Sequence, residues 1–121
     1  MAAFLPRLRA QAGEAHIVNT ASMASLVALP HSSQMPRYIG AYTAIKHAVL
    51  GYTEMLRAEL APEGIGVSVL MAAGQVGPVV VAGIRANRLH IFTHPELRAA
   101  VEQRHQRVMK DFDFFAGSGT E

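Results

Sequence analysis

An alternation of short apolar runs with longer helical stretches constrains the fold of this chain more than any other feature. Residues 16–21 and 65–71 are short and mostly apolar, which is typical of strands buried inside a sheet. Between them, residues 39–61 carry apolar side chains at helical spacing. These side chains are Ala41, Ile45, Ala48, Val49, Tyr52, Met55, Leu56 and Leu60. Strands that alternate with helices in this way predict a parallel sheet with helices on its faces.

The rest of the chain continues the alternation. Residues 1–12 read as a short helix and residues 89–93 as a third strand, with loops predicted over 23–38 and 72–78. Residues 79–87 favour no more than a helical turn. A last helix is expected from Pro95 to about residue 111. Its inward side chains would be Leu97, Val101, Val108 and Phe112. The predicted fold class is therefore α/β, with about three parallel strands and flanking helices.

Composition excludes several classes of protein. The 121 residues fit a single domain over 1–121, and half of them are apolar, so a packed core is expected rather than disorder. The chain has no cysteine and no apolar run near the roughly 20 residues of a membrane span. Its net charge of +2 gives a weak field, and aromatic residues do not interleave with the basic ones as nucleic-acid binding requires. We expect a cytoplasmic protein with no membrane or nucleic-acid partner.

Tyr42 and Lys46 are the first candidates for chemistry. They stand four residues apart on the predicted helix over 39–61, so their side chains share a face. A free phenol is a poor base at neutral pH, and a neighbouring cation favours its phenolate form. Such a pair can act as a general acid/base on a hydroxyl or carbonyl group. The alternative is an ordinary helix with an interfacial tyrosine and a solvated lysine.

Ser22 is the third candidate. It follows the first predicted strand and therefore lies at the carboxyl edge of the sheet, where open α/β sheets bind their ligands. A hydroxyl group there can donate to a substrate carbonyl and accept from a phenol. The alternative is a serine that satisfies local backbone donors. The six histidines form no ligand pattern, so no metal site is predicted.

Together these segments resemble the short-chain dehydrogenases/reductases. Residues 16–22 (HIVNTAS) look like that family's fifth strand with its catalytic serine, and residues 41–51 (AYTAIKHAVLG) look like its active-site helix. Residues 59–70 resemble the end of that helix and the sixth strand. Residues 87–96 resemble the seventh strand and the start of the last helix in one subgroup. The resemblance implies a partial Rossmann-like three-layer fold, covering the carboxyl-terminal half of the family's domain.

The resemblance also implies an activity and a set of roles. Tyr42 would be the catalytic acid/base and would also contact the cofactor. Lys46 would favour the phenolate of Tyr42 and hold the nicotinamide ribose, and Ser22 would position the substrate oxygen. Gly74 and Val76 match family positions that touch the nicotinamide amide. The cofactor would be NAD or NADP, and the substrate a small alcohol or ketone.

One departure leaves a second function open. The glycine-rich turn that holds the cofactor pyrophosphate in the family does not occur in this sequence. The alternative is therefore a truncated, catalytically inactive remnant that acts as an oligomerising or interaction module. In either case we expect a homo-oligomer, formed through the active-site helix or through an exposed strand edge.

Overall fold

The computed structural model describes residues 3–11, 13–27, 39–72 and 76–118. Its centre is one sheet of three parallel strands, β1 (Ala15–Ala21), β2 (Ile65–Met71) and β3 (His90–Phe92). The strand order is β1-β2-β3. Ala15 pairs with Ile65 at the start of the β1–β2 register, and Val69 pairs with His90 at the start of the β2–β3 register. The prediction of a parallel α/β sheet is confirmed.

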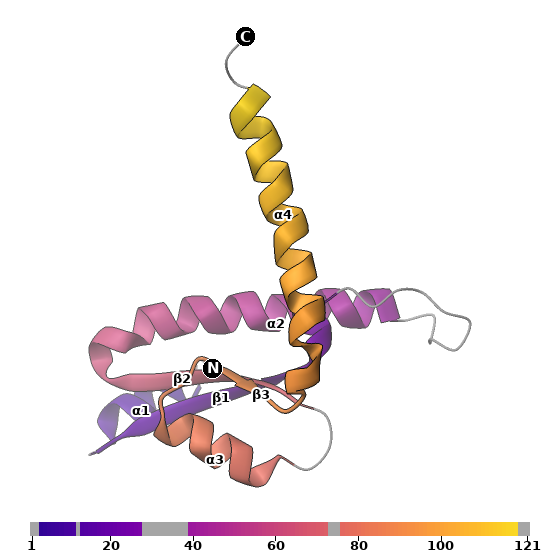
Figure 1. Cartoon of the computed structure of the whole chain (residues 1–121). Helices are drawn as coiled ribbons and strands as arrows, with labels where there is room; N and C mark the ends of the chain where they lie inside the picture. The colour runs from indigo at the N-terminus through magenta and orange to yellow at the C-terminus, as the bar shows by residue number, and fades with distance from the viewer. Residues whose placement is uncertain (1–2, 12, 28–38, 73–75, 119–121) are drawn as a thin grey trace.

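Helices cover both faces of this sheet and make three layers. In Figure 1 the long helix α2 (Ile39–Leu60) lies above the sheet and α3 (Gly77–Arg85) lies below it. The core forms between α2 and the strand residues that point toward it. Its two buried clusters comprise Ile17, Leu56, Leu60, Ile65 and Val67 in one and Ala21, Leu50, Val69 and Met71 in the other.

The face of α2 that packs on the sheet differs in part from the predicted stripe. Leu56 and Leu60 are buried as expected, but the contact face continues through Leu50 and Thr53. Ile45 and Met55 are instead more than half exposed, at 62% and 54%. The periodicity of apolar residues did not indicate which side of the helix would be buried. The sheet covers only one of its two apolar sides.

Two shorter segments complete the amino-terminal side of the body. Helix α1 (Leu5–Ala10) carries Pro6 in its first turn, where a missing amide proton costs nothing, and its Leu5 and Leu8 pack on the first cluster. The turn η2 (Ala61–Glu63) ends at Gly64, whose φ of 70° is the left-handed conformation that favours glycine.

A polar chain crosses the sheet on the side opposite α2. The Nε2 atom of His16 lies 2.7 Å from Oγ of Ser68, and that hydroxyl group donates to the carbonyl oxygen of Arg88 at 2.5 Å. Arg57, which belongs to α2 itself, donates to the carbonyl oxygens of Val67 and Asn87. Burial, with the positive charge of Arg57 as a second cause, lowers the pKa of His16 below its ordinary value.

The last helix departs most from the sequence prediction. After the turn η3 (Pro95–Leu97), α4 runs over Arg98–Ser118 and stands away from the sheet (Figure 1). Val108 and Phe112, which were predicted to point inward, are 43% and 67% exposed. The prediction was wrong because the apolar side of this helix continues past the end of the body. Among the described helices, none has the length and apolar character needed to cross a membrane.

Candidate active site

The carboxyl ends of the three parallel strands meet at one edge of the sheet. Ser22 follows β1, Ala72 follows β2 and Thr93 follows β3. The hydroxyl group of Thr93 donates to the carbonyl oxygen of Met71 at 3.1 Å, which ties the ends of β2 and β3 together. Open parallel sheets bind ligands at this edge because the connecting loops, and not the strands, present their side chains there.

Tyr42 and Lys46 lie on the first turns of α2. The Nζ atom of Lys46 is 5.5 Å from the centroid of the Tyr42 ring, so the ammonium group lies over the ring as a cation–π pair. Tyr42 is 38% exposed, which leaves the phenol accessible to a ligand. The predicted sharing of one helix face is confirmed.

Ser22 begins the turn η1 (Met23–Ser25). Its hydroxyl oxygen accepts from the backbone amide of Ala24 at 3.2 Å, and Ser25 Oγ accepts from the Ser22 amide in return, which completes a capping box. Ser22 thus satisfies a local backbone donor, which was the alternative interpretation of this residue. This hydrogen bond occupies one acceptor lone pair of the hydroxyl group and leaves its proton able to donate to another oxygen.

The turn that follows Ser22 packs on the same helix that carries Tyr42 and Lys46. The turn η1 lies against α2, so the segment that begins at Ser22 and the helix that carries Tyr42 are neighbours. The 19 residues between Ser22 and Tyr42 include 28–38, which lie outside the described part of the chain.

Of the two residues predicted to contact the nicotinamide amide, the described part of the chain includes only one. Val76 is a half-buried residue that precedes the first turn of α3, at the same edge of the sheet. Gly74 lies outside the described residues. Residues 79–87, predicted as a short helical turn, lie mostly within α3, a helix of nine residues that starts at Gly77.

An apolar cavity at this edge was not predicted from the sequence. It has a volume of about 340 Å³. Its lining comprises Met23, Phe92, His94, Pro95, Arg98, Val101 and Glu102. The sequence did contain a signal for this cavity, namely the large apolar residues Met23 and Phe92 at the ends of predicted strands. Across the described ranges, no group of three or more His, Asp or Glu side chains is arranged to hold a metal ion.

Comparisons with known proteins agree with this architecture. A family model described as short chain dehydrogenase matches residues 1–88. A 1-deoxy-11-beta-hydroxypentalenate dehydrogenase from Streptomyces exfoliatus is 41% identical over 86 residues, which make up 71% of this chain and 28% of that protein.

Solved structures extend the similarity over most of the chain. A short-chain dehydrogenase from Novosphingobium aromaticivorans superposes with a TM-score of 0.73 and 32% identity, over 90% of this chain and 43% of the other. The apo form of LigD from Sphingobium sp. strain SYK-6 gives a TM-score of 0.76 and 29% identity, over 91% of this chain and 47% of the other. The chain spans less than half the length of each of these three relatives.

Proposed function

The chain belongs to the short-chain dehydrogenase family, and we propose from this that Ser22, Tyr42 and Lys46 form the site of an NAD(P)-dependent oxidoreductase. The reaction would interconvert a small alcohol and its carbonyl compound. The observation that carries the proposal is the pairing of Lys46 with the accessible Tyr42 on α2, next to the turn that Ser22 caps.

Proton handling falls to this chain's own residues. In the direction of alcohol oxidation, the substrate O–H proton passes to the phenolate oxygen of Tyr42, while the Ser22 hydroxyl group donates a hydrogen bond to the substrate oxygen. In the direction of reduction, the Tyr42 phenol returns the proton. The ammonium of Lys46 stabilises the phenolate. NAD(P) supplies the hydride chemistry when it is bound.

The residues present fit one end of that cofactor. Lys46 offers three donors beside Tyr42, which suits the hydroxyl groups of a ribose. Val76 offers an apolar contact at the start of α3. The glycine-rich turn that would hold the pyrophosphate is absent from the 121 residues of the sequence. We therefore assign the nicotinamide end of the site to this chain and the phosphate-binding residues to protein outside it.

One observation favours the second candidate, an oligomerising module. A groove of about 650 Å³ runs between β1 and α2, lined by Asn19, Thr20, Ile45, Ala48, Val49 and Tyr52. Among the described strands, β1 pairs only with β2, so its other edge has unsatisfied backbone groups beside this groove. Open strand edges recruit further strands. A second copy of the chain docked there would cover both the edge and the exposed Ile45.

Calorimetric titration with NAD⁺, NADH, NADP⁺ and NADPH separates the two functions. Micromolar binding of one cofactor that weakens in Lys46→Ala supports the oxidoreductase and shows that the phosphate end is not essential. Absence of binding, with self-association that is lost in Ile45→Asp, supports the module. Glu59→Gln, at an exposed position elsewhere on α2, is the control for the Ile45 substitution.

A further inference from the structure

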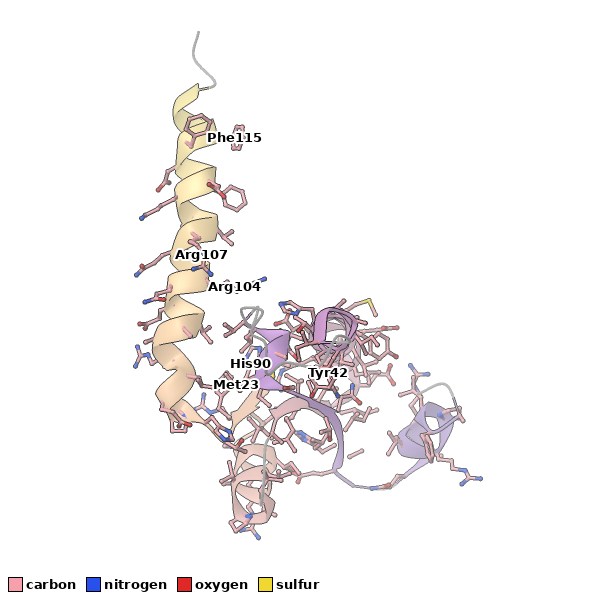
Figure 2. The ribbon with its side chains drawn as sticks, turned by 90° about the vertical axis from the view of Figure 1, so that its right-hand side faces the viewer. Met23, Tyr42, His90, Arg104, Arg107 and Phe115 are labelled. Atoms are coloured by element: carbon pink, nitrogen blue, oxygen red, sulfur yellow. The ribbon has the colours of Figure 1, made fainter. Side chains whose placement is uncertain are left out.

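Helix α4 carries a seam of apolar side chains and one histidine, and the carboxyl-terminal part of this seam is exposed. Val101, His105, Val108, Phe112 and Phe115 follow one another at spacings of four, three, four and three residues. This is the spacing of core positions in a two-stranded coiled coil. Phe112 and Phe115 are 67% and 71% exposed. Figure 2 shows Phe115 far along the helix, beyond Arg104 and Arg107 and away from the sheet.

The charges beside the seam specify how a second helix would lie against it. Arg104 and Asp111 occupy successive equivalent positions on one flank of the seam, seven residues apart. In a parallel pair of identical helices, these positions would face Met109 and Ala116, and no ion pair would form. In an antiparallel pair the same flank faces itself, so Arg104 of one copy can meet Asp111 of the other.

Only one antiparallel register makes this pairing favourable. When Val101 lies opposite Phe112 and His105 opposite Val108, two-fold symmetry gives two Arg104–Asp111 pairs. A slip of seven residues in one direction puts Arg104 opposite Arg104, and a slip in the other direction puts Asp111 opposite Asp111. Like charges in those registers repel, so the sequence selects one register against its neighbours.

The same register places aromatic side chains at the apolar cavity. Arg98 and Val101 both line that cavity and belong to the first turns of α4. Opposite them in the antiparallel pair lie Phe115 and Phe112 of the second copy. In this register, the apolar space of about 340 Å³ at the carboxyl edge of the sheet is thus adjacent to two phenylalanine rings of the second copy.

We propose that two copies of this chain associate through α4 in an antiparallel pair, in which Phe112 and Phe115 of each copy cover the cavity at the carboxyl edge of the other. The interface is isologous, since each copy contributes both the cavity and the phenylalanines. It is separate from the groove between β1 and α2, and it requires no catalytic activity of the chain.

Charge exchange tests the register. Arg104→Asp and Asp111→Arg each create two like-charge pairs, so each variant alone should self-associate at least tenfold more weakly than the wild-type chain in sedimentation equilibrium. An equimolar mixture of the two variants forms two Asp–Arg pairs per dimer and should recover wild-type association. Lys110→Asp and Asp113→Arg make the same charge changes on the outer side of α4 and should leave association unchanged, with helix content checked by circular dichroism.

The outcomes decide between the two surfaces. Unchanged association of both single variants, a mixture no tighter than its components, or a wild-type chain that stays monomeric at several hundred micromolar would each overturn the proposal. Association through the groove on α2 would respond to Ile45→Asp and not to charge exchange.

Disulfide trapping tests the contact with the cavity. The chain has no cysteine, so introduced thiols report alone. A mixture of Val101→Cys and Phe112→Cys chains should form a mixed disulfide under mild oxidation, because these positions face each other in the proposed register. Either chain alone should form little. Equal cross-linking of Val101→Cys with itself would contradict the antiparallel register.

Discussion

The Nζ atom of Lys46 lies 5.5 Å from the centroid of the Tyr42 ring, one turn further along α2. The contact orients the long lysine side chain along the helix toward the phenol. The turn η1, which Ser22 caps, packs on the same helix. This arrangement places a phenol and a cation on one helix face, with the phenol accessible, and the first two predictions test its proposed role.

Removing only the phenolic oxygen isolates proton transfer. Tyr42→Phe keeps the ring and its cation–π contact with Lys46, so we expect the fold and cofactor affinity to stay within twofold of wild type. Turnover of an alcohol substrate, followed as nicotinamide absorbance, should fall by about 10²–10⁴, the usual contribution of a general acid/base. Tyr52→Phe, on an exposed tyrosine of the same helix, is the matched control. Undiminished turnover in Tyr42→Phe would refute the catalytic role.

Removing the cation has a broader effect. Lys46→Met keeps the length of the side chain and loses its charge and its donors. We expect both weaker cofactor binding and lower turnover, since the ammonium is proposed to act on the ribose and on the phenolate. Arg57→Met would break a structural contact, so Lys110→Met on α4 serves as the control for loss of a positive charge. A purely structural Lys46 would leave cofactor affinity unaltered.

The close approach of β1 and β2 limits what Gly66 can become. A Cβ atom at this position would overlap the ring of His16, which Ser68 holds in place. Gly66→Ala should therefore lower the free energy of unfolding by about 1–3 kcal/mol, as overpacking of a filled core does. Gly51→Ala, where an added Cβ meets nothing within 4 Å, should instead stabilise α2 by about 0.5–1 kcal/mol. Chemical denaturation of both variants measures the difference.

Stability should decrease on mild acidification. Burial and the charge of Arg57 lower the pKa of His16 in the folded chain, so protons bind more tightly to the unfolded chain. The contribution of this group is complete above about pH 6.5, the ordinary histidine value, and is lost as pH falls through the lower pKa of the folded state.

The difference between variants isolates that contribution. Unfolding midpoints of wild type and His16→Asn should diverge at pH 7 and converge as pH falls below 6.5. His47→Asn, at a histidine of α2 that lies outside the proposed seam of α4, should parallel wild type throughout. Parallel curves for wild type and His16→Asn would show that the neutral form of His16 is not preferred by the fold.

The strands and α2 were predictable within one or two residues because their signals are local. Apolar runs bounded by Gly13, Gly64 and turn residues identified β1 and β2, and Gly64 adopts the left-handed conformation that its position implies. The spacing of Tyr42 and Lys46 predicted their shared face. Their proposed catalytic roles, and that of Ser22, remain predictions.

The exposed apolar faces were not predictable, because they depend on what lies opposite. Ile45 and Met55 repeat at helical spacing as regularly as Leu56 and Leu60, but the sheet reaches only the second pair. Phe112 likewise continues the periodicity of Val101 on a part of α4 that leaves the body. The apolar cavity depends on η1, β3, η3 and α4 meeting, which is a tertiary contact that periodicity does not encode.

The register of the sheet has a consequence for the rate of folding. Ala15 pairs with Ile65, so the first contacts between β1 and β2 join residues fifty positions apart. Closing so long a loop is entropically costly, and chains dominated by such pairings fold slowly. The 22 residues of α2 shorten the effective separation once they are helical, because a helix rises only about 1.5 Å per residue. We therefore expect the formation of α2, the helix that carries Tyr42, to determine how quickly β1 and β2 pair.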